Sequence, residues 1–437
     1  MADHPLSITA PAEVRRIACS FPSFRDFVDD ALFHPAWGYY STGNVRFGEG
    51  GHYDTFPLSL SPLFGRMLVE YAYRVWRRAG KPAEIELCEI GAGNGQLCLD
   101  VIIWTYEQAR HGRSWTRFAR ALRYRIIERS PALIARQKEK LGALSPHVTW
   151  TQADLAERAA RGVPFAPCGL VFANEVLDCL AHHKVVRQPG GTPGAVFVVP
   201  TVVGQGVESS SVPRKQLARA LGDQRLRDRM QFREVVLPLH VVPGLRPFVR
   251  RHYPEFFEPR RRFKPYFACP AIEVLIRNAA RLYRSGEMLW IDYGEWRDFH
   301  LKAREENRVF AGPPKSGASV YRAPGHDDIT FLVDFSVVAA AAEAAGLRVK
   351  FYGPQVELAR RSGVVFDRRA RDLILRYRML GWMLALVGIG PERAWRNTSL
   401  TWDPDAAQGG SMRNDVNRAV AELLGKRSSN FKLMILG

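Results

Sequence analysis

The stretch that most constrains the fold of this chain runs from Glu86 to Leu97. An alternating apolar run ends at the acidic Glu89, and an apolar pattern with helical spacing begins at Leu97. Three glycines stand between them, and this order predicts a strand, a tight turn and a helix. Glycine permits such a turn and lets a ligand approach the backbone, while the helix start offers free N–H groups. These glycines are Gly91, Gly93 and Gly95, with Gln96 where a dinucleotide-binding fingerprint has its third glycine.

Polar residues also follow later predicted strands. Glu128 comes directly after the apolar strand pattern of residues 124–127, and a carboxylate there can accept both hydroxyl hydrogens of a ribose. The continuous apolar run 169–173 is typical of a central parallel strand, and it leads into Asn174, Glu175 and Asp178. Strands that alternate with helices predict an α/β protein with a doubly wound, mostly parallel sheet. Ligands of such sheets bind beyond the carboxyl ends of the strands.

The net charge of +18 favours an acidic partner, although an arginine-rich proteome would give the same balance. Arginine runs at 225–229 and 260–264 stand among aromatic residues, a mixture that can bind RNA by charge and stacking. No RNA-binding signature accompanies them, so a solvated arginine face is the favoured interpretation and nucleic acid is not an expected partner.

The six cysteines contain no C-x-x-C pair, which argues against a disulfide framework and against a zinc site, and no metal is expected. The N-terminus lacks the apolar core of a signal peptide. The longest apolar stretch, residues 379–390, is shorter than the ~20 residues that a membrane span needs. We therefore expect a cytoplasmic protein without a membrane span.

Several motifs resemble the MidA-like methyltransferases, bacterial relatives of the mitochondrial respiratory complex I assembly methyltransferase. Residues 24–40 read F-x-x-F-x-x-x-A-L-x-H-P-x-x-G-Y-Y, and the first strand ends in an acidic residue before G-x-G-x-G. The segment 128–137 resembles E-x-S-P-x-L-x-x-x-Q, and 174–178 resembles N-E-x-x-D. D-Y-G at 292–294 and P-G-x-x-D-I-T-x-x-V-D-F-S at 324–336 complete the resemblance.

The resemblance implies a class I Rossmann-like methyltransferase with a helical N-terminal cap and an inserted acceptor-binding subdomain. It implies S-adenosyl-L-methionine (SAM) as cofactor and S-adenosyl-L-homocysteine as product. The residues that it assigns to the cofactor are Glu89, Gly91, Gly93, Gly95, Glu128, Asp154 and Asn174. Asn174, Glu175 and Asp178 are expected to flank the methyl group, with Tyr293 lining the same crevice.

The chain departs from the family pattern on the acceptor side. His52 and Leu58 replace an aspartate and a glutamate of the family, and Cys179 and Ala181 replace an alanine and a proline. The family's activity implies methylation of a protein arginine, oriented by carboxylates. The alternative of an O- or N-methyltransferase that acts on a small, anionic metabolite stays open. In that case His52, His182 or His183 is the expected base. A non-catalytic assembly or binding protein on the same fold is the third alternative.

Five segments are expected along the chain. They are an N-terminal helical cap and lid loop (1–80), the first part of the SAM-binding core (81–183), the acceptor-recognition insertion (184–275), the second part of the core (276–360) and a C-terminal helical region (361–437). Residues 1–20 are expected to form a loose arm, and residues 110–123 a basic linker. The oligomeric state stays open, a homodimer included.

Overall fold

The computed structural model describes residues 6–42, 45, 61–157, 166–188, 191–204, 209–258, 264–303, 305, 308–311, 319–364 and 431–437. The chain divides into two compact units. Unit 1 comprises Met1–Asn44, Asp178–Glu273 and Glu295–Val337, and unit 2 comprises Val45–Leu177, Val274–Gly294 and Val338–Gly437. His52, Leu58 and the predicted C-terminal helices beyond residue 364 lie outside the described residues.

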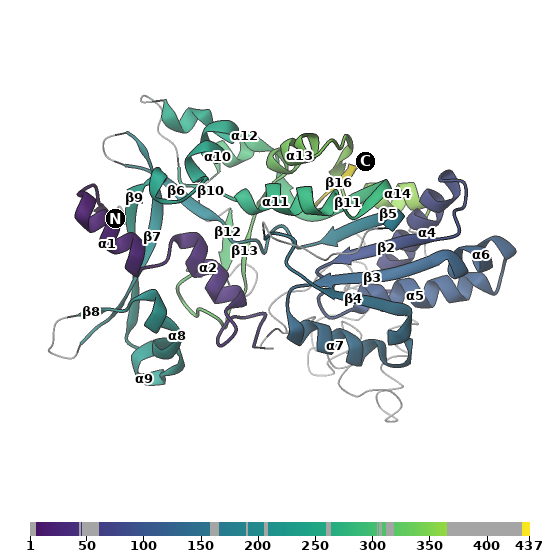
Figure 1. Ribbon diagram of the computed structural model, residues 1–437, viewed down its shortest axis with the longest axis horizontal. Coiled ribbons are helices and arrows are strands. Elements are labelled where there is room, and N and C mark those ends of the chain that lie inside the picture. The colour runs from purple at the N-terminus through teal and green to yellow at the C-terminus, as the bar shows by residue number, and fades with distance from the viewer. Residues whose placement is uncertain are drawn as a thin grey trace, which may run out of the picture. The chain divides into compact units, whose positions relative to one another are not determined.

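Unit 2 is built on a twisted sheet with the strand order β15-β16-β11-β5-β2-β3-β4 (Figure 1). The bounds are β2 (Ile85–Ile90), β3 (Leu122–Glu128), β4 (Val148–Gln152), β5 (Ala166–Asn174), β11 (Tyr283–Glu295), β15 (Val349–Pro354) and β16 (Phe431–Leu436). All neighbouring pairs from β4 to β11 are parallel, whereas β16 runs antiparallel to both β11 and β15. The predicted α/β Rossmann-like fold with a mostly parallel sheet is confirmed.

Helices cover both faces of this sheet. The helices of unit 2 include α4 (Leu63–Arg78), α5 (Gln96–Ala109), α6 (Arg113–Ala121), α7 (Pro131–Leu141), η1 (Gly142–His147) and α14 (Val356–Ser362), and α11 (Pro270–Ala279) and α13 (Phe335–Ala344) lie mostly within it. On one face, Trp76 of α4 and Phe118 of α6 pack with Phe172 of β5 in a large apolar cluster. Met288 and Met434 point to the other face and are also fully buried. Burial on both faces explains why these strands are continuous apolar runs.

Unit 1 contains a second sheet with the order β1-β9-β7-β6-β10, and β8 pairs with β7. The strands of this sheet are β1 (Leu6–Ser7), β6 (His183–Arg187), β7 (Pro193–Val202), β8 (Ser210–Ser211), β9 (Met230–Pro238) and β10 (Tyr266–Ala268). Outside this sheet, unit 1 also contains the antiparallel pair β12 (Val309–Ala311) and β13 (Ile329–Phe331), and the short strand β14 (Val333–Asp334). The helices are α1 (Pro11–Ser20), α2 (Phe24–Phe33), α8 (Arg214–Gly222), α9 (Gln224–Arg227), η2 (Leu239–Val241), α10 (Leu245–His252), η3 (Pro254–Phe257) and α12 (Arg297–Lys302).

Local sequence signals placed several of these elements correctly. Ser23 directly precedes the apolar positions of residues 24–32 and is the N-cap of α2, where its Oγ accepts the backbone N–H of Asp26 at 3.2 Å. The Gly- and Pro-rich residues 190–194 predict a hairpin, and β6 and β7 do pair antiparallel, with Val185 opposite Ala195. The apolar run 431–436 predicts a strand near the end of the chain, and it forms β16.

Three local predictions were wrong. Residues 110–123 contain helix α6 instead of a linker, because Phe118 and Ala121 form a buried stripe between its arginines. Residues 11–20 form helix α1 instead of a loose arm, with Ile17 buried. Ser336 does not cap α13, because that helix begins at Phe335 and Asp334 Oδ1 accepts the N–H of Ser336 at 3.0 Å.

The compact units also divide the chain differently from the five expected segments. Helix α4, expected within the N-terminal cap, belongs to unit 2, and residues 295–337, expected within the core, belong to unit 1. Among the described residues, no helix is long and apolar enough to cross a membrane. The same part of the chain contains no group of three or more His, Cys, Asp or Glu side chains that could hold a metal ion.

Candidate active site

The glycine turn between β2 and α5 has the predicted strand–turn–helix geometry. Gly91, Gly93 and Gly95 all have positive φ angles, of 67°, 53° and 80°. A Cβ atom on Gly91 would lie 2.8 Å from Cγ2 of Val176, so a side chain at this position meets both steric conflict and backbone strain. The N–H of Gly91 donates to the carbonyl of Ile127 at 2.9 Å, which ties the turn to the end of β3.

Gln96, at the position of the missing third glycine, has a structural role. Its Nε2 donates to Asp100 Oδ1 at 2.8 Å, and its Oε1 accepts from Lys140 Nζ at 3.1 Å. The side chain of Gln96 is buried in this network. A longer polar residue therefore stabilises the first turn of α5 where a dinucleotide-binding protein has only a glycine.

Glu89 at the end of β2 is buried and is held by a partner that the sequence did not single out. The Tyr124 hydroxyl donates to Glu89 Oε2 at 2.6 Å. Burial raises the pKa of Glu89 to about 7, the Tyr124 hydrogen bond opposes this shift, and the nearby charge of Glu128 adds to it. Glu89 therefore changes its charge near neutral pH.

Glu128 is the last residue of β3, and both of its carboxylate oxygens already accept hydrogen bonds. Oε1 accepts the N–H of Ser130 at 2.9 Å, and Oε2 accepts from Gln137 Nε2 at 3.2 Å. Burial raises the pKa of Glu128, and these hydrogen bonds oppose the shift. Gln137 Nε2 also donates to the carbonyl of Gly93 at 3.0 Å, so this one side chain links Glu128 to the glycine turn.

Asp154 lies after β4 and is engaged by its own neighbours. Its Oδ1 accepts the N–H of Ala156 at 2.8 Å, and its Oδ2 forms an ion pair with Arg129 at 3.2 Å. The carboxylate thus stabilises the turn after β4 and fixes Arg129, the residue next to Glu128. Its predicted contact with an adenine amino group stays a prediction.

Asn174 and Glu175 form a hydrogen-bonded pair at the end of β5. Asn174 Nδ2 donates to Glu175 Oε1 at 3.0 Å, while Asn174 Oδ1 is buried and has no hydrogen-bond partner within the described part of the chain. Glu175 has a φ angle of 52°, which turns the chain out of the sheet. The three-residue spacing of Glu175 and Asp178 suits one face of a helix, but residues 175–180 form bends and a turn and no helix.

Asp178 belongs to unit 1, where three motifs that are far apart in the sequence meet. The carbonyl of Asp178 accepts the N–H of Phe331 at 2.9 Å. The Tyr40 hydroxyl donates to Asp328 Oδ1 at 3.0 Å and lies 3.2 Å from Sγ of Cys179. Burial, and then the charge of Asp178, raise the pKa of Asp328 to about 7. Sequence analysis assigned no role to Tyr40 or Asp328, although both stand in quoted motifs.

His182 and His183 also lie in unit 1, and burial lowers their pKa values to about 3 and about 4. His182 stacks on the ring of Phe331 with 4.3 Å between ring centroids. His183 begins strand β6 and pairs with Ala268 of β10. Both imidazoles are therefore neutral at physiological pH and have low proton affinity.

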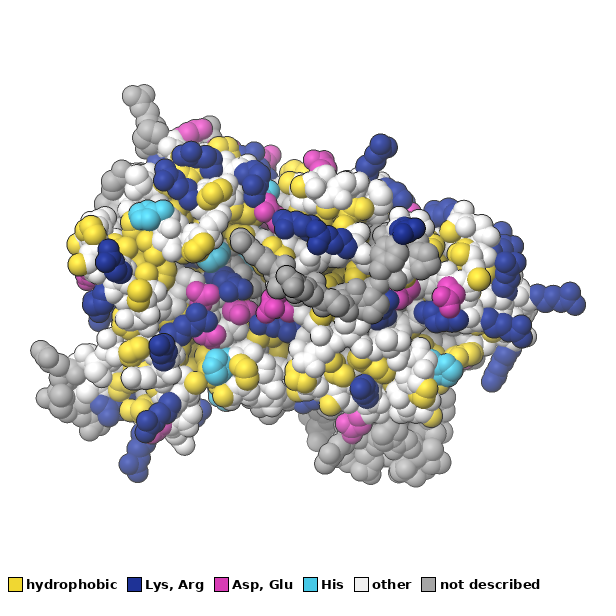
Figure 2. Space-filling view, in the orientation of Figure 1, with side chains coloured by type: hydrophobic (Ala, Val, Ile, Leu, Met, Phe, Trp, Pro, Cys, Tyr) yellow, Lys and Arg dark blue, Asp and Glu magenta, His cyan; other side chains and the backbone are white. Residues whose placement is uncertain are grey.

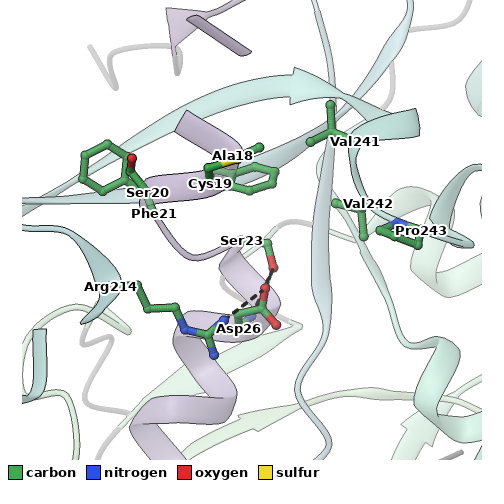
Figure 3. Close-up of a pocket in the computed structure, with 11 residues that line it drawn as sticks. Ala18, Cys19, Ser20, Phe21, Ser23, Asp26, Arg214, Val241, Val242 and Pro243 are labelled. Carbon is green, nitrogen blue, oxygen red and sulfur yellow. Dashed lines mark hydrogen bonds and ion pairs between the residues drawn. The ribbon is translucent and has the colours of Figure 1, made fainter. Parts of the chain in front are cut away.

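A pocket of about 210 Å³ in unit 1 lies apart from these residues (Figure 3). The walls come from the end of α1, the start of α2, and Val241 to Pro243. Asp26 and Arg214 point toward each other across it, and Ser23 Oγ donates to Asp26 Oδ2 at 2.7 Å. None of the predicted site residues lines this pocket.

The predicted cofactor residues belong to unit 2, and the parallel register brings the ends of their strands to one edge of the sheet. They are Glu89, Gly91, Gly93, Gly95, Glu128, Asp154 and Asn174. In the same unit, Glu175 directly follows β5, and Tyr293 lies two residues before the end of β11, where its ring makes an edge contact with Phe431.

Elsewhere in unit 2, Arg77, Arg113, Arg117 and Arg120 are exposed on α4 and α6, within a surface rich in basic side chains (Figure 2).

Comparison with known proteins identifies relatives that match most of the chain. Residues 67–353 match the family model described as "Putative S-adenosyl-L-methionine-dependent methyltransferase". A mitochondrial protein arginine methyltransferase of Danio rerio, NDUFAF7, is 35% identical over 379 residues, which cover 80% of this chain and 75% of the relative. The Xenopus laevis protein of the same name is 25% identical, and the match covers 71% of this chain but only 64% of that relative.

The fold has a counterpart among solved structures. A Burkholderia thailandensis protein crystallised with S-adenosyl-homocysteine superimposes with a TM-score of 0.61 at 20% identity, covering 99% of this chain and 95% of that chain. The strand order of the sheet, the sequence motifs and the family model all indicate a SAM-dependent methyltransferase. The chain therefore belongs to the family of S-adenosyl-L-methionine-dependent methyltransferases.

Proposed function

We propose that this protein methylates an arginine side chain of a protein partner, with SAM as the methyl donor. The observation that carries the proposal is the Asn174–Glu175 pair, a carboxylate oriented by a neighbouring amide at the end of a central strand. A carboxylate at hydrogen-bonding distance of a guanidinium orients it and stabilises its charge. The relatives named as protein arginine methyltransferases support the same acceptor.

The residues of unit 2 fit SAM on structural grounds. At Gly91 the glycine turn has no room for a side chain. A turn whose backbone lies close to a bound ligand needs such a glycine. The buried and unpartnered Asn174 Oδ1 offers an acceptor to a donor group such as the ligand's amino group. When bound, SAM supplies a methyl group that is already activated by its sulfonium, so the protein's task is alignment of the acceptor.

In this proposal Glu128 accepts the ribose hydroxyls, and the glycine turn contacts the rest of the ligand. Glu175 orients the acceptor guanidinium and takes up the proton that a methylated guanidinium releases. Asp178 lies in unit 1, and the role beside the methyl group that the family resemblance gives it stays a prediction. His52, on the acceptor side of the family pattern, lies outside the described residues and receives no role.

The alternative of oxygen or nitrogen methylation of a small metabolite is less well supported. It requires a base near neutral pH, and burial lowers the pKa values of both His182 and His183 far below that range. The net charge of +18 is the feature that favours it, because a basic surface attracts anionic molecules.

The deciding experiment follows labelled methyl from SAM into a cell extract that is then separated by size. Label in the protein fraction, mapped to arginine, supports the proposal, and label confined to small molecules refutes it in favour of the metabolite alternative. Glu175→Gln is expected to slow transfer while SAM still binds in calorimetry. SAM binding without label in any fraction would instead support a non-catalytic binding protein.

A further inference from the structure

The chain leaves the central sheet at a point of backbone strain. The last ladder pair between β5 and β11 joins Asn174 and Ile291, and the next N–H, of Glu175, donates to the carbonyl of Ile291 at 2.8 Å. Glu175 then adopts a φ angle of 52°. For a residue other than glycine this conformation costs roughly 1–2 kcal/mol, so neighbouring groups have to hold the chain there.

The group that holds it is the carboxylate of Asp292, in strand β11. Asp292 is 0% exposed, its Oδ2 accepts the N–H of Leu177 at 3.0 Å, and its Oδ1 accepts the N–H of Tyr293 at 2.9 Å. Two backbone N–H groups, one after β5 and one in β11, are thus held by the two oxygens of one carboxyl group. Leu177 is only 1% exposed, so water does not compete for its N–H.

The segment fixed in this way packs directly against the glycine turn. Val176 lies between the strained Glu175 and the clamped Leu177, and its Cγ2 is the atom closest to the position of a Cβ on Gly91, at 2.8 Å. Movement of this segment therefore displaces the Asn174–Glu175 pair and also the support of the cofactor turn. Displacements of about 1 Å at such places cost up to ~100-fold in rate.

We propose that Asp292 is a positioning residue for methyl transfer, which sets residues 174–177 in register with the glycine turn. In this assignment it contacts neither reactant and acts through the backbone N–H groups of Leu177 and Tyr293 and, next to Leu177, through the side chain of Val176. The inference rests on membership of the SAM-dependent family and on no particular acceptor.

Asp292→Asn tests it, because the two side chains have the same shape and the amide has only one oxygen that can accept an N–H. The variant is expected to weaken S-adenosylhomocysteine binding by about tenfold, the loss of one hydrogen bond. It is also expected to slow label transfer from saturating SAM into the cell extract, and to expose the Leu177 amide to hydrogen exchange.

Asp334→Asn is the matched control in unit 1. Asp334 is another buried carboxylate that accepts a backbone N–H, from Ser336 at 3.0 Å, so its loss lowers the melting temperature. It is expected to leave the affinity for S-adenosylhomocysteine within about twofold of wild type, because the N–H that Asp334 accepts belongs to helix α13 and not to residues 174–177. If Asp292→Asn lowered the melting temperature like this control and left the affinity and the label-transfer rate unchanged, Asp292 would be merely structural.

Should Asp292→Asn fail to fold, Val176→Ala tests the same path by removing the methyl groups that lie under Gly91. A loss of S-adenosylhomocysteine affinity of about threefold or more supports the path, and an unchanged affinity overturns it. The outcome is separate from that of the acceptor proposal. Label confined to small molecules would refute arginine methylation and leave the effect of Asp292 on binding intact.

Discussion

Glu89→Gln should change how the stability of unit 2 depends on pH. The wild-type carboxyl is buried at the end of β2, with the Tyr124 hydroxyl 2.6 Å from Oε2. Burial raises its pKa from an ordinary value of 4.5 to about 7, so the folded state holds a proton that the unfolded state has already lost. Glutamine resembles the protonated acid in shape and cannot ionise.

The sign follows from proton linkage. An acid whose folded pKa is raised is fully stabilising below pH 4.5, and it loses this contribution as the pH rises toward 7. With 1.36 kcal/mol for each pKa unit, this single group lowers the stability by about 1.4 kcal/mol at pH 5.5 and about 3.4 kcal/mol at pH 8.5. The wild type should therefore lose about 2 kcal/mol more than Glu89→Gln between these two pH values.

Urea unfolding without cofactor, followed at both pH values, measures this difference. Glu107→Gln is a suitable control, because this glutamate belongs to the same unit, in helix α5, and is exposed to solvent. It should retain the pH dependence of the wild type. Equal pH dependence in wild type and Glu89→Gln would refute the reasoning, since it would mean that Glu89 ionises alike in the folded and unfolded chain.

Three further predictions concern the ligand and the histidines. Gly91→Ala should greatly weaken SAM binding in calorimetry. Gly80 is the control, because it has a similar φ of 80° but open space around its Cβ position, so Gly80→Ala should cost only ~1–2 kcal/mol of stability and leave binding unchanged. Equal losses of SAM binding in the two variants would contradict the steric argument. Glu128→Gln should weaken SAM binding by about tenfold in the same assay, and undiminished affinity would rule out the ribose contact. His183→Gln should leave the pH profile of methyl transfer unchanged between pH 6 and 8, because the pKa of His183 is lowered to about 4; a lost inflection in that range would restore it as a base.

Much of the cofactor side was predictable because its signals are local. A strand, its acidic end and the glycine turn follow one another within Glu86–Leu97, and steric limits on φ act on single residues. The end of β3 at Glu128 was predictable in the same way. The parallel order of these strands followed from their alternation with helices.

The partners of these residues were not predictable, because distant segments supply them. Tyr124 reaches Glu89 only through the pairing of β3 with β2, and Gln137 reaches Gly93 through the packing of α7. Tyr40 and Asp328 are separated by 288 positions. The positive φ of Glu175 was hidden as well, since no sequence signal marks a glutamate as left-handed and the helical spacing to Asp178 suggested the opposite.

The place of β16 in the sheet has a consequence for folding during synthesis. Among the described strands, β15 joins the sheet through β16, and β16 also pairs along β11. The ribosome therefore makes β15 roughly 75 residues before β16, a delay of about 4 to 15 s at ordinary elongation rates, and it makes β11 earlier still. Over this interval the unpaired edge of β11 is open to other strands, so nascent chains of this protein should depend on chaperones until residue 436 has emerged.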